Sequence, residues 1–520
     1  MKIFELLDKT PFTLIQGNPE AEVKGISHDN RKVKEGDIFV CVRGSHFDTH
    51  DVIEDAVSKG ASLLIIEKDV PLPEGVAAIK VDSSRAAVSY IAASFYGMPA
   101  EKLNIIAITG SKGKTTATHM MAAILREAGY RTGTIGTNGA VYPLTEEALK
   151  IPGAERYHYV DCEETPGHAY YELHNTTPEP TELQMHLAMM VASGCTHLVM
   201  EVSSQAIKQN RVDGMVFDHG IWTNLATGDH IGGAEHETFD DYAWCKAQVL
   251  NMSKLRYVNL DDPYYEDFVK YINKLTIPYG ESEEAVYRAQ EIQNVYDEET
   301  RSPGVAFKVS GLCSGYFMIN MPGEFNVYNA LSCIAVANQI EIPPEPIKKA
   351  LANLKIRARY NPTYDGKFRV FVDYAHNGYS TINHLEGLKE YRPNRIICVY
   401  SADGSRDRSR RWEMGEICAE MADISIVSEG HSRYESFESI RDDILIGIAK
   451  GEEKIGRPST YEVIQDRVAA IRRAIDLAEE GDIVTIIGVG GHKSYLDING
   501  VEEPHSDIET VREYIKELGI

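Results

Sequence analysis

Short apolar runs alternate with helical patterns along the whole chain. In the first 98 residues three apolar runs precede a segment with apolar positions at helical spacing: 37–42, 61–67, 77–81 and 84–96. Runs of this length between amphipathic segments are typical of the strands and helices of an α/β domain. A turn near Gly97-Met-Pro-Ala then leads into the apolar run 104–109. The pattern therefore predicts a small α/β domain that ends near residue 98.

A second boundary lies near residues 340–366, which include Ile342-Pro-Pro-Glu-Pro and Asn361-Pro-Thr-Tyr-Asp-Gly. Beyond it four apolar runs predict buried strands, with helical patterns between them: 368–372, 395–400, 424–427 and 482–487. Strands alternating with helices predict a Rossmann-like, doubly wound sheet. A chain of 520 residues is also too long for one core. We therefore expect an α/β protein with three domains, at 1–98, 99–356 and 357–520.

Residues 141–175 interrupt this pattern. The segment is polar, rich in tyrosine, glutamate and proline, and has no clear periodicity. Long segments without periodicity inside a compact domain are usually surface insertions with a functional role. We expect such an insertion here.

Composition and charge exclude several function classes. The formal net charge of −25 argues against binding to nucleic acids or anionic membranes. No apolar stretch approaches the ~20 residues that span a bilayer, and the charged start of the chain is unlike a secretory signal. The eight cysteines show no metal-binding spacing, which is typical of reduced, packing thiols. A cytoplasmic protein without membrane insertion is expected.

The strongest chemical signal follows the run 104–109. It continues as Gly110-Ser111-Lys112-Gly113-Lys114-Thr115-Thr116 and then as a helical pattern, 117–128. A strand, a glycine-containing turn and a helix form the setting in which backbone N–H groups bind phosphates. Lys114 would reach the β- and γ-phosphates, and Thr115 or Thr116 would bind Mg²⁺. The spacing is shorter than in the common nucleotide-binding motif, so a plain strand–turn–helix connection is the alternative.

Glu201 ends the buried apolar run 196–202. Ligands of open α/β sheets bind at the carboxyl ends of the strands, and a carboxylate there is a natural Mg²⁺ ligand. The alternative is an acidic cap of the next helix.

Several further motifs occur in one order along the chain. They are Asn175-Thr-Thr-Pro-Glu-Pro, Glu201-Val-Ser-Ser-Gln-Ala, Arg211-Val-Asp-Gly, Thr223-Asn-Leu, Gly228-Asp-His, Ala243-Trp-Cys-Lys-Ala-Gln, Phe325-Asn-Val-Tyr-Asn and Asp373-Tyr-Ala-His-Asn. With the phosphate loop, this set resembles the Mur ligase family over nearly the whole chain. The likeness is greatest to members that add the third residue of the peptidoglycan stem peptide.

The resemblance implies a three-domain architecture: a UDP-sugar-binding N-terminal domain, a central P-loop ATPase domain, and a C-terminal Rossmann-like domain that binds the amino acid and closes over ATP. It also implies an ATP-dependent amide ligase that activates a UDP-MurNAc-L-Ala-D-Glu-type carboxylate as an acyl-phosphate. An amino acid then attacks this intermediate in cell-wall peptide synthesis.

The resemblance further implies ATP and two Mg²⁺ sites. Thr115 and Glu201 would belong to the first metal site and His230 to the second, and Lys246 would be carbamylated to bind metal. Lys114 completes the expected catalytic set. Without the resemblance, Lys246 is an ordinary solvated lysine of an amphipathic helix.

Two more residue sets follow from the resemblance. ATP would be bound by residues 110–116 and by Asn326, Asn329, Arg359, Asp373 and His376; helix caps are the alternative for the two asparagines. The nucleotide-sugar peptide would be bound by Asn30, Arg31, Asn175, Thr176, Thr177, Ser203 and Arg211.

The chain departs most from the family at the site of the incoming amino acid, expected at Arg406, Arg411, His431, Arg433, Gly491 and Lys493. Gly430-His-Ser-Arg replaces an Asp-Asn-Pro-Arg stretch, and Gly491-His-Lys replaces Gly-His-Glu. A lysine in place of that glutamate would repel an ammonium group unless another carboxylate, such as Glu429, substitutes. We therefore predict an unusual or repositioned third amino acid.

Two other functions stay open at this point. One is a related amide ligase of secondary metabolism, pseudomurein-like assembly or poly-amino-acid synthesis. The other is a nucleotide-binding scaffold without catalysis, against which the retained Lys114, Glu201, His230 and Lys246 argue. The expected partners are a UDP-sugar peptide, ATP and an amino acid, with the protein a monomer.

Overall fold

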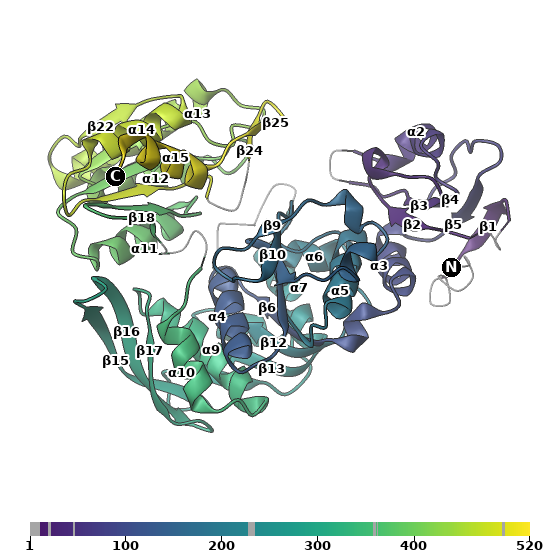
Figure 1. Cartoon of the computed structure of the whole chain (residues 1–520), viewed down its shortest axis with the longest axis horizontal. Helices are drawn as coiled ribbons and strands as arrows, with labels where there is room; N and C mark the ends of the chain where they lie inside the picture. The colour runs from purple at the N-terminus through teal and green to yellow at the C-terminus, as the bar shows by residue number, and fades with distance from the viewer. Residues whose placement is uncertain are drawn as a thin grey trace. The chain divides into compact units, whose positions relative to one another are not determined.

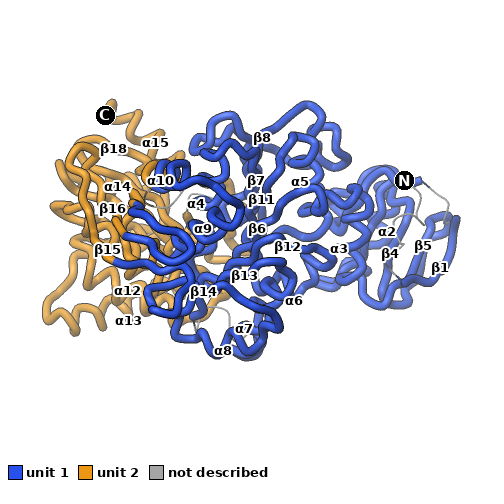
Figure 2. Tube along the Cα trace, turned by 90° about the horizontal axis from the view of Figure 1, so that it is seen from below, with its two compact units in different colours: residues 1–290, 308–317, 328–351 blue, residues 291–307, 318–327, 352–520 orange. Residues whose placement is uncertain are grey.

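The computed structural model describes residues 11–18, 22–44, 47–226, 235–356, 360, 362–490 and 495–520. The chain forms two compact units (Figure 2). The first consists of Met1–Gln290, Lys308–Phe317 and Tyr328–Leu351, and the second of Glu291–Phe307, Met318–Val327 and Ala352–Ile520. The first two predicted domains thus share one unit, while parts of 291–327 belong with the C-terminal domain.

The N-terminal domain is a five-stranded sheet in the order β1-β5-β4-β3-β2. Its elements are β1 Thr13–Gln16, β2 Gly25–Ser27, β3 Asp37–Val40, α2 Ile53–Ser58, β4 Leu63–Ile66, β5 Ala77–Lys80 and α3 Ser84–Phe95. Strands β2 to β5 are parallel, and β1 pairs antiparallel to β5. One face of the sheet packs on α3 and the other on α2, which explains why β3 and β4 are buried throughout.

The central sheet of the first unit has the order β14-β13-β12-β6-β11-β7-β8-β10-β9. Its strands are β6 Asn104–Thr109, β7 Thr132–Gly136, β8 Gly139–Pro143, β9 Val160–Asp161, β10 His168–Tyr171, β11 His197–Glu201, β12 Phe217–Trp222, β13 Ser253–Asn259 and β14 Ile277–Gly280. Strands β14 to β7 are parallel, whereas β8, β10 and β9 continue the sheet in antiparallel fashion. The carboxyl ends of β6, β11 and β7 therefore meet at one edge.

Helices cover this sheet on both faces (Figure 1). They are α4 Lys114–Glu127, α5 Pro180–Ala192, α6 Ser204–Lys208, α7 Phe239–Asn251, α8 Tyr265–Val269, α9 Phe325–Gln339 and α10 Pro344–Ala352. Strands β15 Tyr287–Asp297, β16 Ser302–Gly311 and β17 Gly315–Ile319 follow β14 in the chain and are divided between the two units.

The expectation of a wholly surface insertion at 141–175 is wrong. Strands β8 and β10 extend the central sheet, and the rings of Tyr142 and Tyr171 stack in its core at 5.3 Å. Tyr142, Tyr170 and Tyr171, which made the segment look polar, are buried. The part between β8 and β9, with 3₁₀ turns at Ala148–Lys150 and Ala154–Arg156, lies outside the sheet.

The C-terminal domain is a six-stranded sheet in the order β18-β19-β23-β20-β21-β22. Its elements are β18 Pro362–Asp365, β19 Arg369–Val372, α11 Gly378–Lys389, β20 Ile396–Tyr400, α12 Ser409–Met421, β21 Ile424–Val427, α13 Phe437–Ile455, β22 Tyr461–Val463, α14 Arg467–Leu477, β23 Ile483–Ile486, and after them β24 Tyr495–Ile498, β25 Val501–Pro504 and α15 Asp507–Leu518. Five strands are parallel, with α11 to α13 on one face and α14 and α15 on the other (Figure 1). The predicted doubly wound sheet is confirmed.

Candidate active site

The phosphate loop, residues 110–116, connects β6 to α4 at the carboxyl edge of the central sheet. Helix α4 begins at Lys114 with Gly113 as its N-cap, and no side-chain hydrogen bond caps it. The N-terminus of a helix favours a bound anion. The Lys114 ammonium donates to the carbonyl oxygens of Gly110 at 2.8 Å and Ser111 at 3.2 Å. A cation and a helix N-terminus thus lie together at this edge.

Two glycines of the loop have no room for a side chain. Gly110 has φ 150°, and a Cβ there would collide with the hydroxyl of Thr223. Gly113 has φ 82°, and a Cβ there would collide with the side-chain oxygen of Asn329. The glycines therefore permit a close approach of neighbouring elements to the loop.

Glu201 lies at the end of β11, beside this loop, and is buried. One carboxylate oxygen accepts from the Thr115 hydroxyl at 2.9 Å and from the Thr137 N–H at 2.8 Å. Burial raises the pKa of Glu201, and the Lys114 charge together with these hydrogen bonds offsets the effect only in part. A buried carboxylate of raised pKa gains most from a bound cation, so Glu201 and Thr115 are suited to Mg²⁺.

Lys246 comes from α7 and is only 2% exposed. Its ammonium donates to the Gly110 carbonyl at 2.8 Å and lies 4.5 Å from the ring centre of Tyr242, one turn earlier in the helix. Burial, and after it the charge of Lys114, lower the pKa of Lys246 well below 10.5. The reading of Lys246 as a solvated lysine is thereby excluded, and the residue lies at the phosphate loop.

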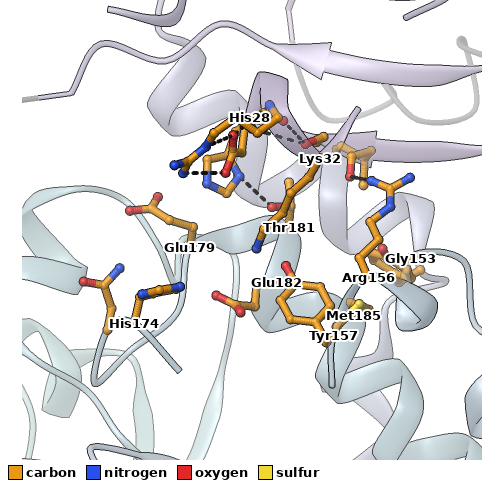
Figure 3. A pocket seen from close by; sticks show the side chains of 16 residues that line it. His28, Lys32, Gly153, Arg156, Tyr157, His174, Glu179, Thr181, Glu182 and Met185 are labelled. Carbon is orange, nitrogen blue, oxygen red and sulfur yellow. Dashed lines mark hydrogen bonds and ion pairs between the residues drawn. The ribbon is translucent and has the colours of Figure 1, made fainter. Parts of the chain in front are cut away.

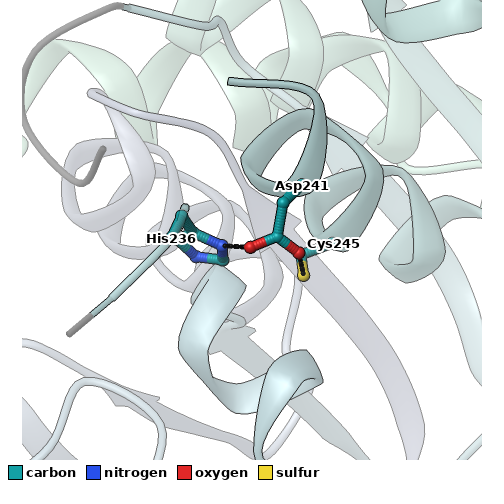
Figure 4. A group of neighbouring side chains, drawn as sticks. All are labelled: His236, Asp241 and Cys245. Atoms are coloured by element: carbon teal, nitrogen blue, oxygen red, sulfur yellow. Dashed lines mark hydrogen bonds and ion pairs between the residues drawn. The ribbon is translucent and has the colours of Figure 1, made fainter. Parts of the chain in front are cut away.

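The described residues contain one group of potential metal ligands with donor atoms within 4.8 Å of one another: His236, Asp241 and Cys245 (Figure 4). Asp241 already pairs with the Lys208 ammonium at 2.8 Å and accepts from His236 Nδ1 at 2.8 Å. Burial and then the charge of Asp241 raise the pKa of the Cys245 thiol to about 12. In the structure these side chains bind one another and Lys208 at the start of α7.

A cavity of about 230 Å³ lies where the N-terminal domain meets the central sheet (Figure 3). Its walls come from three segments. They are residues 26–32, residues 153–157 of the insertion, and residues 174–185, and Tyr96 adds a further side chain; the lining includes His28, Asp29, Arg31, Lys32, Arg156, Tyr157, His174, Asn175, Glu179 and Thr181. His28 Nδ1 lies 2.8 Å from the Thr181 hydroxyl across the cavity. Aromatic, cationic and amide groups together suit a nucleotide sugar.

The insertion binds directly to the N-terminal domain at this cavity. Arg156 donates through one nitrogen to both oxygens of Asp37, at 2.8 and 2.9 Å, and both side chains are buried. Glu155 pairs with Lys34 at 2.7 Å, and the Lys32 ammonium lies 4.5 Å from the ring centre of Tyr157. Residues 153–157 are therefore a wall of the cavity.

The residues expected to bind the nucleotide-sugar peptide do not all line the cavity. Arg31 and Asn175 line the cavity, whereas Asn30 donates to Asp55 at 2.7 Å and does not line it. Thr176 and Thr177 lie beside Glu201: the Thr176 hydroxyl is 3.0 Å from that of Thr137, and Thr177 donates to the Glu201 carbonyl. Ser203 caps α6, accepting from the N–H of Ala206. Arg211 pairs with Glu179 at 2.9 Å.

Three of the residues expected to bind the amino acid, Arg406, His431 and Arg433, lie on loops at the carboxyl edge of the C-terminal sheet. His431 and Arg433 follow β21, and both contact Asp497 of β24: His431 Nδ1 accepts from its N–H, and the Arg433 N–H donates to its carbonyl. Arg433 also pairs with Asp403 at 3.1 Å. Arg406 lies on the same loop as Asp403, half-buried.

Arg411 differs from the other residues expected at this edge. It is buried in α12 and pairs with Glu435 at 2.8 Å and Asp443 at 3.0 Å. Glu435 also accepts from the N–H of Ser405. Arg411 is therefore linked through Glu435 to the loop residue Ser405, and two carboxylates already balance its charge.

Among the described residues expected to bind ATP outside the phosphate loop, Asn326, Asn329 and Asp373 are buried, and His376 is half-buried. Asn326 donates to the Pro322 carbonyl at 2.7 Å at the start of α9, and Asn329 contacts Gly113. Asp373 follows β19 and accepts from the N–H of Ala375, while His376 Nδ1 donates to the Tyr374 carbonyl. His230, Arg359, Gly491 and Lys493 lie outside the described residues.

Three family models match the chain in order. They are described as the Mur ligase family catalytic domain, residues 22–96, the Mur ligase middle domain, residues 108–337, and the Mur ligase glutamate ligase domain, residues 357–490. A UDP-N-acetylmuramoyl-L-alanyl-D-glutamate–2,6-diaminopimelate ligase from Clostridium perfringens is 35% identical over 501 residues, 95% of either chain. The chain belongs to the Mur ligase family.

Solved Mur ligases share this fold. The structure of a UDP-N-acetylmuramoyl-L-alanyl-D-glutamate–2,6-diaminopimelate ligase matches with a TM-score of 0.61 and 24% identity, over 100% of this chain and 99% of that one. MurF ligase from Thermotoga maritima in complex with ADP matches with a TM-score of 0.61 and 17% identity, over 95% and 97%. The predicted fold class is confirmed, and the scaffold alternative finds no support among these ligases.

Three further residues surround the phosphate loop and Glu201: Thr137 was not singled out from the sequence, and Thr223 and Asn224 were quoted in a motif without a role. Thr137 binds Glu201 through its N–H and its hydroxyl, and it follows β7, the neighbour of β11. Thr223 donates to the Lys112 carbonyl at 2.6 Å, and Asn224 accepts the Lys112 N–H at 2.8 Å. Their positions just after parallel strands of one sheet were the available signal.

Within the part of the chain that the structure describes, no helix is both long and apolar enough to cross a bilayer. The eight cysteines are free thiols, and seven are buried, as expected of packing residues.

Proposed function

We propose that this Mur ligase uses ATP to join an amino acid to the free carboxylate of a UDP-MurNAc-L-Ala-D-Glu acceptor. The observation that carries the proposal is the arrangement of Lys114, Thr115 and Glu201 around the N-terminus of α4. It supplies a cation, helix N–H groups and an acidic metal ligand at one place, as transfer of a phosphoryl group requires. The named activity of the Clostridium perfringens relative supports the same reaction.

The reaction has two steps. An oxygen of the acceptor carboxylate attacks the γ-phosphorus of ATP, the bond to the bridging oxygen breaks, and ADP leaves. The amine nitrogen then attacks the carbonyl carbon of the acyl-phosphate, the bond to the phosphate oxygen breaks, and phosphate leaves as the nitrogen loses its proton. Lys114 and the first turn of α4 offset the charge that gathers on the phosphoryl oxygens.

Mg²⁺ belongs to this proposal, with Thr115 and Glu201 at the first site and His230 and carbamylated Lys246 at the second. Bound Mg²⁺ would lower the repulsion between the two anions. Carbamylation requires a neutral amine, and the lowered pKa of Lys246 increases the fraction of its amine that is neutral at a given pH. Carbamylation would also replace a buried ammonium group by an anionic carbamate that can bind a metal ion.

The cavity between residues 26–32, 153–157 and 174–185 is the proposed site of the nucleotide-sugar end. Thr176 and Thr177 then lie along the path from this cavity to Glu201, since both belong to the segment that continues from Asn175. The acceptor would thus extend from the N-terminal domain to the phosphate loop within one compact unit.

The identity of the amino acid is the point where this chain differs from its relatives. Their names specify 2,6-diaminopimelate. Here Asp403 pairs with Arg433, so the charge of this arginine is balanced before a substrate carboxylate arrives. This pairing favours an amino acid other than diaminopimelate, and with it the alternative of a related ligase joining a different amine.

Phosphate release from ATP, measured with UDP-MurNAc-L-Ala-D-Glu and a panel of amino acids, tests the proposal. We expect release only when both partners are present. A strong preference for meso-diaminopimelate would refute the unusual amino acid but support the ligase. Release that ignores the acceptor, or none with any amino acid, would contradict the proposed reaction.

A further inference from the structure

Three loops leave the carboxyl edge of the C-terminal sheet, after β20, β21 and β23. Of the described residues expected to bind the amino acid, Arg406 follows β20, and His431 and Arg433 follow β21. One side chain contacts the start of all three loops. It is Arg467, the first residue of α14, which is 3% exposed.

Each nitrogen of the Arg467 guanidinium donates hydrogen bonds. Nη1 donates to the hydroxyls of Ser401 after β20 and Ser428 after β21, at 3.3 and 3.0 Å, and to the carbonyl of Glu429. Nη2 donates to the carbonyl of Ile487 after β23, at 3.2 Å. One planar group therefore joins three strand ends.

Asp507, at the start of α15, forms a bidentate ion pair with this guanidinium. Its two oxygens accept from Nε and Nη2 of Arg467 at 2.7 and 2.8 Å, and His505 Nε2 lies 2.8 Å from the first of them. Both carboxylate and guanidinium are buried, and a bidentate pair fixes orientation as well as distance. The pair therefore sets the direction in which Arg467 presents its remaining donors.

The loops are also packed tightly around the side chain of Ser401, which accepts a hydrogen bond from Arg467. A Cβ at Gly430 or at Gly488 would collide with the side chain of Ser401. A shift of one loop therefore displaces the others, and the contacts of Arg467 determine their common position.

We propose that Arg467, oriented by Asp507, is a positioning residue that sets the mutual placement of the three loops of the amino-acid site. The inference rests on the proposed function, because the substrate of these loops is the incoming amino acid. Arg467 lies beneath the loops and acts through Ser401, Ser428 and the two carbonyls.

Steady-state kinetics of Arg467→Lys and His505→Gln test the proposal, with the amino acid, ATP and the acceptor varied in turn. Lysine keeps the charge but lacks the planar fork. We expect Arg467→Lys to raise the KM for the amino acid about tenfold or more, with the KM values for ATP and acceptor within twofold. His505→Gln, which weakens only the hold on Asp507, should change the same KM in the same direction but less.

Arg395→Lys is the matched control. Arg395 pairs with the buried Asp482 at 2.6 Å and donates to the Leu477 carbonyl, at the amino ends of β20 and β23. We expect it to lower the melting temperature without changing the KM for the amino acid.

Equal changes in all three KM values, an unchanged amino-acid KM in Arg467→Lys, or the same KM change in Arg395→Lys would overturn the proposal. If Arg467→Lys does not fold, His505→Gln and Ser428→Ala decide the question by the same measurement. An unmutated protein without acceptor-dependent turnover would instead contradict the proposed function, and the inference with it.

Discussion

At the residue scale, the sequence was sufficient for the phosphate loop but not for the lysine beside it. Lys114 and Glu201 follow apolar strands, so their place at the carboxyl edge of a sheet was predictable from pattern alone. Lys246 lies on an amphipathic helix, where burial of a lysine is rare. Its burial depends on the Gly110 carbonyl and the Tyr242 ring, and the contact with Gly110 spans 136 positions.

Replacement of Lys114 by alanine removes the cation at the helix N-terminus. We expect kcat for ATP turnover to fall at least about 100-fold, since the charge on the transferred phosphoryl group loses its protein cation. Lys102→Ala, an exposed lysine just before β6, is the control and should retain activity. Phosphate release under saturating substrates measures both, and turnover within a few-fold of the unmutated protein in Lys114→Ala would contradict the assignment.

Carbamylation of Lys246 makes activity depend on dissolved carbon dioxide. Burial and the charge of Lys114 lower the pKa of Lys246, which favours the neutral amine that reacts with carbon dioxide. We expect turnover at pH 7 to fall in carbon-dioxide-depleted buffer and to recover on addition of bicarbonate. Lys246→Arg should be inactive under both conditions. Full activity after depletion would speak against the modification.

At the element scale, strands and helices were predictable where their apolar period was regular, and the insertion was not. β6, β20 and β21 lie where the pattern placed them. Strands β8 and β10 were missed because tyrosines carry their burial, and tyrosine counts as polar in a binary pattern. The contact of residues 153–157 with the N-terminal domain depends on the Arg156–Asp37 pair, which joins positions 119 apart.

The Arg156–Asp37 pair supports the wall of the cavity. Arg156→Ala leaves the buried Asp37 carboxylate without its partner, and such losses cost about 3–5 kcal/mol. We expect the Kd for the UDP-sugar peptide to rise roughly tenfold or more, with the Kd for ATP unchanged. Calorimetric titration measures both constants. Lys34→Ala breaks only an exposed pair, worth at most about 1 kcal/mol, and should have little effect. Equal weakening of ATP binding in Arg156→Ala would contradict this role.

The Arg467–Asp507 pair gives the C-terminal domain an acid-sensitive component of stability. Burial raises the pKa of Asp507, but the charge of Arg467 and the hydrogen bonds from Arg467 and His505 outweigh burial and lower it below 3.8. Because the Asp507 pKa is lower in the folded than in the unfolded state, the ionised carboxylate stabilises the folded protein at pH values above the unfolded-state pKa. This stabilisation is lost as the pH falls through the folded-state pKa. Urea unfolding between pH 6 and pH 3 should therefore show a steeper acid loss in the unmutated protein than in Asp507→Asn. Parallel curves would contradict this reasoning.

At the scale of the whole molecule, the motif order identified the architecture, whereas the sequence left the amino acid open. Since the chain has a net charge of −25, the proposed anionic substrates would depend on local positive groups, such as Lys114 and the N-terminus of α4. The proposed specificity of the amine site would depend on pairs such as Arg433–Asp403, formed by loops after different strands. Pairs between separate loops cannot be inferred from spacing along the chain.

The central claim is that the acceptor carboxylate is activated by phosphorylation at the loop 110–116. Its most direct test is to label the acceptor carboxylate with ¹⁸O, run the complete reaction with the preferred amino acid, and analyse the released phosphate by mass spectrometry. The proposed reaction predicts one ¹⁸O atom in each phosphate molecule and ADP as the nucleotide product. Unlabelled phosphate, or AMP with pyrophosphate, would contradict it.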